Sequence, residues 1–423
     1  MEPHCDSEPY YPKENGIPNN EFKVKKLILL FCLITLPIVS APEMIGEESC
    51  IVESTCTILV PTENGYELYL KNKDPNLAAI KSVTINISLK NMSSDQVSPK
   101  FFVLRGADPV FVTNLKIVDV TKSFFYSYSI TVNMGDWDAK HDDAYSYSLP
   151  FPSGIRARIG QGYNGGFTHS GYLKYSLDFS LPIGTPIHAA RKGIVVSLVK
   201  KYSEGGVRKD LLSKANYVMI QHDDGTIGNY AHLKKDGVTV NIGDQVEEGQ
   251  LIGYSGNTGY SQGPHLHFEV HKPTKDSQII TLPTSFRTQY NDHETLSPFY
   301  LYWKPRQGID PPKTDLLEED ILLCKSNGKE LLTQCNDTNF RLGDRYALQL
   351  EFLKPTKNQI ELLLTTDGDK VEPYYMNWFS QNEGAVEFRY FEIPKHPNFI
   401  GKWKMVVKVN GVEKKVFFFQ VSA

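Results

Sequence analysis

Five polar residues in the middle of the chain have the types and spacing of a hydrolytic metal site. His265 and His267 lie in the segment His-Leu-His-Phe-Glu-Val, which predicts a strand, so both side chains project from one face about 7 Å apart. His169, Asp178 and His232 lie upstream. Two neutral imidazoles and one carboxylate suit Zn²⁺ and leave an open position for water, whose pKa the metal lowers to about 7. Spacing alone does not decide whether His265 or His267 is the ligand.

Several short motifs follow one another around these residues. They are Thr168-His169, Leu177-Asp178-Phe179, residues 182–187, Ala189-Ala190, Gly193, residues 230–233, residues 253–259 and residues 263–269. In this order they resemble the lysostaphin-type zinc metallopeptidases, which are peptidoglycan endopeptidases. The resemblance covers about residues 150–285 and leaves the flanking segments uncovered.

The resemblance implies a role for each of the five residues. His169, Asp178 and His267 are expected to bind one Zn²⁺ ion per chain. His232 and His265 are then the catalytic histidines, which polarise the attacking water and stabilise the oxyanion. We therefore expect three metal ligands and two acid–base groups at one site.

The first motif departs from the family pattern. The short family form has its carboxylate four residues after the histidine, where this chain has Leu173. Asp178 lies nine residues after His169, and the expected downstream sequence follows Asp178. An insertion of five residues between the two ligands, with both flanking strands kept, accounts for the difference.

Other polar residues near the motifs are expected to be structural. His188, His222 and His271 are expected in groove walls or loops, and residues 222–225 (His-Asp-Asp-Gly) are typical of a hairpin turn. The acidic residues 136–143 are expected to form an ordinary solvated loop, because their spacing does not match the EF-hand pattern.

The sequence around the motifs predicts an all-β chain. The central domain is expected to be an antiparallel β metallopeptidase domain with a shallow groove. The predicted divisions are a signal peptide or membrane anchor at 1–41, a β-rich N-terminal domain at 42–150, the zinc metallopeptidase domain at 151–290, a proline-containing linker at 291–312 and a C-terminal immunoglobulin-like β-sandwich at 313–423.

Alternating apolar residues support the two flanking β domains. Residues 83–89 and 126–134 alternate with period two in the N-terminal part, as half-buried strands do. Residues 348–352 and 403–409 do so in the C-terminal part. Asn410-Gly411 follows the last of these runs and is the favoured two-residue hairpin turn, with a second strand after it.

The N-terminus and the cysteines both indicate export. Lysines at positions 23, 25 and 26 precede the apolar run 27–39, and Val39-Ser40-Ala41 resembles a cleavage site for signal peptidase. Cys5 and Cys32 lie in this leader. The other four cysteines form two local pairs, Cys50–Cys56 and Cys324–Cys335, and are predicted to be disulfides. Four free thiols are the alternative; a four-cysteine zinc site needs the two distant pairs to meet.

These features predict an exported zinc endopeptidase that acts on peptidoglycan stem or cross-bridge peptides in the cell envelope. Bonds between D-amino acids and bonds in glycine bridges are both candidates. A net charge of −4 gives no electrostatic basis for binding nucleic acid or an anionic membrane surface. Membrane contact is expected only through the N-terminal segment, if it stays uncleaved. The alternatives are a catalytically silent wall-binding or hydrolase-activating protein of the same fold, and a zinc peptidase acting on a non-wall peptide.

Overall fold

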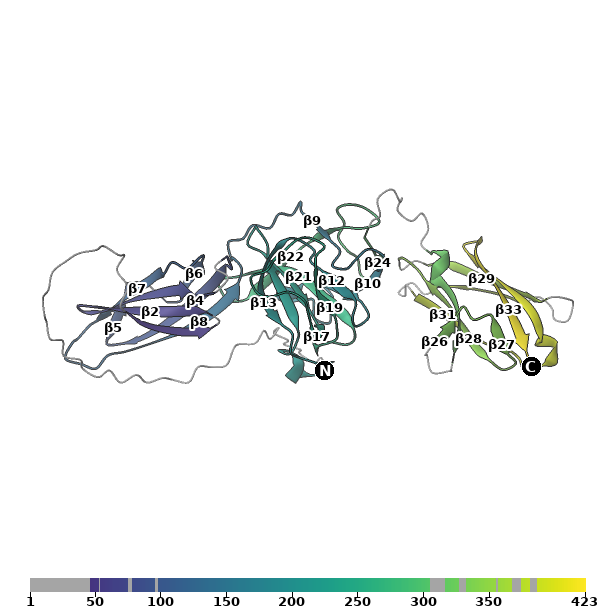
Figure 1. Cartoon of the computed structure of the whole chain (residues 1–423), viewed down its shortest axis with the longest axis horizontal. Helices are drawn as coiled ribbons and strands as arrows, with labels where there is room; N and C mark the ends of the chain where they lie inside the picture. Colours follow the sequence, from purple (N-terminus) through teal and green to yellow (C-terminus); the bar gives the residue numbers. More distant parts are fainter. Residues whose placement is uncertain are drawn as a thin grey trace, which may run out of the picture. The chain divides into compact units, whose positions relative to one another are not determined.

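The structure is a computed structural model. It describes residues 46–304 except 53, 75–77 and 96–97, and residues 316–423 except 327–331, 355–356, 367–373 and 381–385. In this part of the chain the residues form strands β1 to β33 and four short 3₁₀ helices, η1 to η4, with no α-helix (Figure 1). The prediction of an all-β chain is therefore confirmed.

Some of the sequence predictions fall outside the described residues. These are the signal peptide or anchor at 1–41, with Cys5 and Cys32, and the prolines at 305, 311 and 312 of the predicted linker. A search of the described residues for a helix that is long and apolar enough to cross a bilayer finds none. The domain boundaries drawn from the sequence stay predictions.

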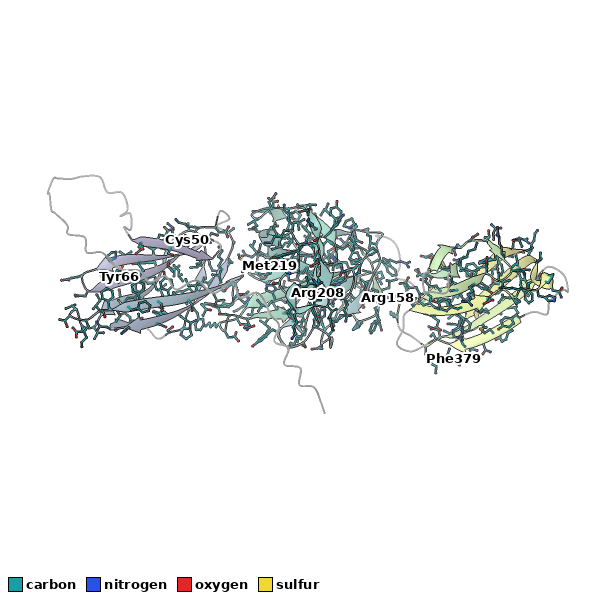
Figure 2. All side chains as sticks on the ribbon, turned by 90° about the horizontal axis from the view of Figure 1, so that it is seen from below. Cys50, Tyr66, Arg158, Arg208, Met219 and Phe379 are labelled. Atoms are coloured by element: carbon teal, nitrogen blue, oxygen red, sulfur yellow. A yellow bond between two sulfur atoms is a disulfide. The ribbon has the colours of Figure 1, made fainter. Side chains whose placement is uncertain are left out.

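The N-terminal β region packs two sheets around one apolar core. The first sheet has the order β1 (Glu47–Val52), β2 (Thr55–Thr62), β3 (Gly65–Asn72), β7 (Val110–Ile117), β5 (Met92–Ser94), and the second has the order β6 (Lys100–Leu104), β4 (Lys81–Lys90), β8 (Phe125–Met134). Tyr66 on β3, labelled in Figure 2, contacts Tyr126 on β8 with ring centroids 5.7 Å apart. The strands predicted at residues 83–89 and 126–134 are confirmed, because these residues lie in β4 and β8.

The central region is built on one long sheet. Its strand order is β18 (Gln245–Val246), β13 (Gly193–Val199), β15 (Tyr217–Gln221), β16 (Ile227–Ala231), β21 (His265–Pro273), β11 (Leu177–Ser180), β10 (Ala157–Gln161), β24 (Leu301–Tyr302), and β22 (Ile279–Leu282) also pairs with β21. β16 and β21 are antiparallel, with Tyr230 opposite Phe268 and Ala231 opposite His267. Tyr230 and Phe268 are fully buried and their rings touch, so apolar packing fixes this register.

Smaller sheets complete the central region. They are the three-stranded sheet β12 (Pro186–His188), β19 (Leu251–Ser255), β17 (Leu233–Val238), the parallel pair β14 (Gly205–Gly206) and β20 (Gly259–Tyr260), and the parallel pair β9 (Ser146–Ser148) and β23 (Ser285–Arg287). Gly205 can only be glycine, because a Cβ atom there would lie 1.6 Å from the carbonyl oxygen of Asn257. The shallow groove expected in this region stays a prediction.

The C-terminal region places two sheets around a second core. One sheet has the order β26 (Leu332–Cys335), β25 (Ile321–Ser326), β28 (Arg345–Glu351), β31 (Val386–Glu392), and the other has the order β27 (Asn339–Arg341), β33 (Val412–Ser422), β32 (Gly401–Val409), β29 (Gln359–Thr366), β30 (Tyr374–Phe379). Leu348 on β28 and Met405 on β32 are fully buried in the same core. Asn410 and Gly411 both have positive φ and connect β32 to β33, which confirms the predicted turn. The immunoglobulin-like assignment stays a prediction.

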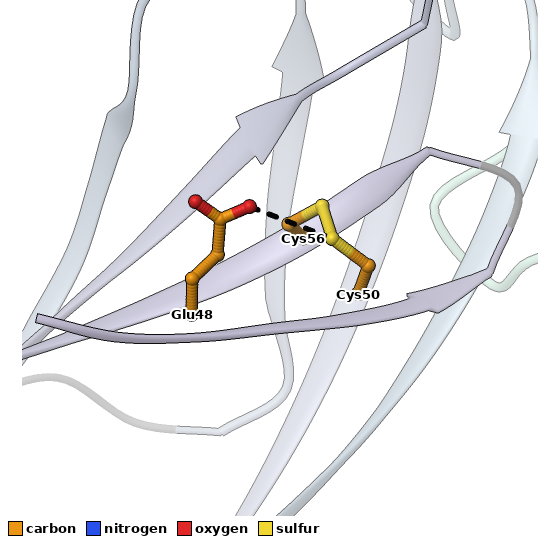
Figure 3. Close-up of side chains that lie close together, drawn as sticks. All are labelled: Glu48, Cys50 and Cys56. Carbon is orange, nitrogen blue, oxygen red and sulfur yellow. Dashed lines mark hydrogen bonds between the residues drawn. A yellow bond between two sulfur atoms is a disulfide. The ribbon is translucent and has the colours of Figure 1, made fainter.

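Both predicted disulfides are present. Cys50 on β1 lies opposite Cys56 on β2, and the two sulfur atoms are bonded (Figure 3). Cys324 on β25 is bonded to Cys335 on β26, its partner in the strand register. Glu48 Oε1 lies 3.5 Å from Cys50 Sγ, but sulfur atoms joined in a disulfide are not thiolates. The Glu48, Cys50 and Cys56 group is therefore not a metal site.

Candidate metal centre and acid–base residues

Strand β21 and the residue after β16 carry three of the five predicted site residues. His265 and His267 are two residues apart on β21, and both are partly exposed. Ala231 is the last residue of β16 and pairs with His267, so the next residue, His232, emerges beside it. His232 has a φ of 62°, an uncommon value for a residue with a side chain, and the chain turns there into β17. The ring centroids of His232 and His265 are 4.5 Å apart.

The structure brings His169, Asp178 and His267 together as a group that can hold a metal ion. One nitrogen or oxygen atom from each lies within 4.8 Å of the others. His169 is fully buried, and its ring centroid lies 5.3 Å from that of His267. Donor atoms around one tetrahedral zinc lie roughly 3.3 Å apart, given bonds of about 2.0 Å. Small side-chain adjustments are therefore enough for the three residues to share one ion.

The nine-residue spacing between His169 and Asp178 is filled by an extra turn. Helix η1 (Gly171–Leu173) follows His169, and β11 starts at Leu177. Leu173, at the position where the short family form has its carboxylate, lies in η1 and is not a member of the metal-binding group. The residues between His169 and Asp178 thus form a turn that ends before β11, and Asp178 is the second residue of that strand.

The hydrogen bonds of His267 indicate which ring nitrogen can face a metal. Its Nε2 lies 3.1 Å from Oε2 of Glu269, and a carboxylate can only accept a hydrogen bond. Nε2 therefore carries the proton and Nδ1 is the nitrogen with the lone pair. A carboxylate behind a ligating histidine fixes the tautomer and ring orientation in this way at many metal sites.

Glu269 is the centre of a buried polar cluster below the site. Besides His267, its neighbours are Ser176 Oγ at 2.8 Å, Asn229 Nδ2 at 3.3 Å and His271 Nδ1 at 3.2 Å. Burial raises the pKa of Glu269, but hydrogen bonds from His267 and His271 lower it well below its usual range. Glu269 is thus an ionised acceptor that can balance the positive charge of a metal.

His232 and His265 are held at the same ring atom. Nδ1 of His232 lies 2.6 Å from the carbonyl oxygen of Thr258, and Nδ1 of His265 lies 2.8 Å from that of Gly263. Because a carbonyl oxygen only accepts, Nδ1 is protonated in both rings and Nε2 has the lone pair. Each imidazole is therefore held in one orientation by its Nδ1, with the lone pair on Nε2.

The comparisons with known proteins identify this segment. Residues 172–279 match Peptidase family M23, a range that contains Asp178, His232, His265 and His267 and begins just after His169. Residues 172–279 are an M23 peptidase domain. This confirms the family suggested by the sequence motifs.

Three curated relatives are similar to part of this chain. Peptidoglycan DD-endopeptidase ShyA of Vibrio cholerae is 42% identical over 22% of this chain and 19% of its own length. Lysostaphin of Staphylococcus staphylolyticus is 36% identical over 31% of this chain and 22% of its own length. Glycyl-glycine endopeptidase ALE-1 of Staphylococcus capitis is 36% identical over 31% of this chain and 30% of its own length. The chain thus spans less than a third of the length of each relative.

The other histidines of the M23 domain lie outside the metal-binding group. His222 is buried at the β15–β16 turn, where its backbone N–H donates to Thr226, and the predicted hairpin turn is confirmed. Burial first, and then the charge of Arg191, lower the pKa of His222 to about 3. His188 is the last residue of β12. His271 lies in strand β21 and not in a loop, with Nδ1 3.2 Å from an oxygen of Glu269.

The acidic segment at 136–143 forms a loop between β8 and β9. Asp136 pairs with Arg105, and His141 Nδ1 lies 2.8 Å from an Asp143 oxygen. These contacts agree with the expected ordinary loop.

Two contacts of the M23 domain were not anticipated from the sequence. Glu269 lies two residues after His267 on the same strand face, so the period-two pattern that paired His265 with His267 also contained it. Thr258 acts through its backbone carbonyl, which any residue has, and nothing in the sequence marks it.

Proposed function

We propose that this chain is an exported zinc-dependent endopeptidase that hydrolyses peptide bonds in peptidoglycan stem or cross-bridge peptides. One observation carries the proposal. Atoms of His169, Asp178 and His267 lie within 4.8 Å of one another, and the ring of His232 lies 5.9 Å from that of His267. Metal donors and two fixed imidazoles at one place are the components of metal-assisted hydrolysis.

The donor set fits zinc. Two imidazole nitrogens and one carboxylate oxygen are ligands that Zn²⁺ prefers, and three protein ligands leave a position for water or substrate. Zinc bound there supplies Lewis acidity, which acidifies water and polarises a peptide carbonyl. Glu269 supports this assignment, because it holds His267 with Nδ1 deprotonated.

His232 and His265 are the acid–base groups in this proposal. With Nδ1 of each ring donating to a carbonyl oxygen, Nε2 can accept a proton from the attacking water. The same nitrogen, once protonated, can donate to the developing oxyanion or to the leaving amine. The 4.5 Å between the ring centroids lets both rings serve one scissile bond.

The substrate class is proposed from the relatives. ShyA is named a peptidoglycan DD-endopeptidase and ALE-1 a glycyl-glycine endopeptidase, so two kinds of peptide bond are candidates. Export is proposed from the predicted leader and from two disulfides, which persist in oxidising compartments.

The test uses the full chain on purified cell walls. We expect turbidity to fall with the wild type, to stay constant with a zinc chelator, and to fall again when zinc is restored. Asp178→Asn should bind zinc weakly and leave the walls intact, because an amide supplies no negative charge to the metal. His293→Ala is the matched control, because it removes an exposed histidine that is hydrogen-bonded to Ser146. This variant should bind zinc and lyse the walls as the wild type does.

The released fragments decide between the two bonds. Mass analysis should show either new D-amino acid termini or new glycine termini. If the protein binds zinc and cleaves other peptides but releases no fragment from any wall, it is a zinc peptidase with a non-wall substrate. Wall binding without hydrolysis of any peptide would point to a catalytically silent protein. An Asp178→Asn variant with one tightly bound zinc and full activity would remove Asp178 from the ligand set.

A further inference from the structure

The turn between His169 and Asp178 is fastened to the sheet by two buried hydroxyl groups. The turn itself is short: the Leu173 N–H donates to the Ser170 carbonyl at 3.0 Å, and the Ser176 N–H donates to the Leu173 carbonyl at 3.0 Å. These local bonds shape the turn but do not attach it to neighbouring strands. His169 and Asp178 lie at the two ends of the turn, so a movement of the turn changes the distance between these two residues.

The first attachment is Thr281 on β22. Its hydroxyl donates to the Tyr172 carbonyl at 2.9 Å and accepts from the Tyr175 N–H at 3.0 Å. Thr281 is 1% exposed, so water cannot replace these bonds. One hydroxyl thus uses its donor and an acceptor lone pair on two backbone groups of the turn. β22 pairs with β21, with Thr281 opposite His271, so the turn is joined to the strand that carries His267.

The second attachment is Ser176, the last residue of the turn. It is fully buried, and its hydroxyl donates to Oε2 of Glu269 at 2.8 Å. The same oxygen receives the hydrogen bond from Nε2 of His267. Ser176 lies two residues before Asp178, so one carboxylate oxygen connects the segment of Asp178 with the ring of His267.

We propose that Thr281 and Ser176 are positioning residues that make the nine-residue spacing compatible with zinc binding. Thr281 holds the middle of the extra turn, and Ser176 holds its end to the carboxylate that orients His267. Together they keep His169, Asp178 and His267 at separations that one ion can bridge. This inference rests on the proposed zinc function and adds two residues that do not touch the ion.

The experiment measures zinc affinity by competition with a chromogenic chelator on the full chain. Thr281→Val keeps the shape of the side chain and removes the hydroxyl, whereas Thr281→Ser keeps the hydroxyl. We expect Thr281→Val and Ser176→Ala to weaken zinc binding by about 10-fold to 100-fold, the usual effect of removing a group that orients metal ligands. Thr281→Ser should bind zinc nearly as the wild type does.

Thr113→Val is the matched control. Thr113 is fully buried in the N-terminal region and its hydroxyl contacts Ser94, so the variant loses a buried hydroxyl far from the M23 domain in sequence. It should lose thermal stability without losing zinc affinity. The melting temperature of each metal-free protein, measured alongside, separates loss of stability from loss of positioning.

Two outcomes overturn the inference, and they differ from failure of the proposed function. If both Thr281→Val and Ser176→Ala bind zinc as tightly as the wild type, the two hydroxyl groups have only a structural role, whatever the melting temperatures of the variants. Equal weakening by Thr281→Val and Thr281→Ser assigns the effect to packing. A wild type that binds no zinc overturns the proposed function itself. Should Thr281→Val fail to fold, Ser176→Ala still decides the question.

Discussion

At the scale of single residues, the histidines on and beside β21 differ in the ring nitrogen that is hydrogen-bonded. Nε2 of His267 donates a hydrogen bond to Glu269, so Nδ1 is the nitrogen with the lone pair that a metal ion needs. In His232 and His265, Nδ1 donates to a backbone carbonyl oxygen, so the lone pair is on Nε2. His267 thus differs in tautomer from His232 and His265, and the acceptor beside each ring determines the difference. In the proposed function, this difference in acceptor is what distinguishes the metal ligand His267 from the two acid–base histidines.

This difference predicts different defects in the histidine variants. His267→Ala should lose most bound zinc, because a ligand is removed. His232→Ala and His265→Ala should keep zinc and lose turnover by about 10²-fold to 10⁴-fold, the contribution of a positioned acid–base group. The double variant should lose less than the product of the single effects, because both groups act in one transition state. Metal content and rate are measured on each variant; loss of zinc in His265→Ala with retention in His267→Ala reverses the assignment.

The sequence predicted which functional side chains lie close together better than it predicted the groups around them. The proximity of His169, Asp178 and His267 is confirmed, although the choice between His265 and His267 came from the family resemblance and not from spacing. Glu269 could have been found from strand periodicity. The carbonyl groups of Thr258 and Gly263 could not, because a backbone acceptor leaves no trace in residue type.

At the scale of elements, alternation found the strands and missed some of their ends. The runs at 83–89 and 126–134 lie in β4 and β8, since one face of each strand packs on the core. β33 begins at Val412, directly after the Asn410-Gly411 turn, although the apolar pattern gives that strand no clear start. Its first residues are paired but exposed or half-buried, so no apolar pattern marks them. The turn between His169 and Asp178 also lacks such a pattern, because side-chain hydroxyls attach it.

The β15–β16 turn predicts a dependence of stability on pH. His222 is buried there, close to Arg191, Asp223, Asp224 and His141, and its pKa is lowered to about 3. In the unfolded chain its pKa is about 6.5. Between these values the unfolded state holds the extra proton, so the free energy of unfolding falls as pH drops below about 6.5 and continues to fall towards pH 3.

Denaturant unfolding of metal-free protein at a series of pH values tests this. His222→Asn removes the titrating ring at the same position. Its free energy of unfolding should fall less steeply with acid than that of the wild type, and the difference in slope should approach one proton. Parallel curves for the two proteins would show that His222 does not titrate differently on folding.

At the scale of the whole molecule, the chemistry belongs to one region and the covalent bridges to the other two. Cys50–Cys56 lies in the N-terminal β region and Cys324–Cys335 in the C-terminal sandwich, six and eleven residues apart in sequence. The M23 domain contains no cysteine. A chelator is therefore expected to affect the activity, and a reductant is expected to affect the stability that the disulfides provide.

Removing the bridges should lower stability without emptying the metal site. For loops of this length the chain-entropy estimate is about 2 kcal/mol for Cys50–Cys56 and about 3 kcal/mol for Cys324–Cys335. The variants Cys50→Ser with Cys56→Ser, and Cys324→Ser with Cys335→Ser, should show losses of this size in the free energy of unfolding, with zinc content unchanged. Loss of zinc in either double variant contradicts the separation of the regions. Alkylation of four thiols in protein recovered from the envelope contradicts the disulfides themselves.

The local span of the two bridges also determines what happens when the backbone is cut. Each disulfide joins neighbouring strands of one hairpin. Neither of the two bridges links the N-terminal β region to the C-terminal region. A single proteolytic cut between Cys56 and Cys324 leaves no covalent link between the two fragments. Fragments produced by such processing should separate on a denaturing gel equally well with and without reductant.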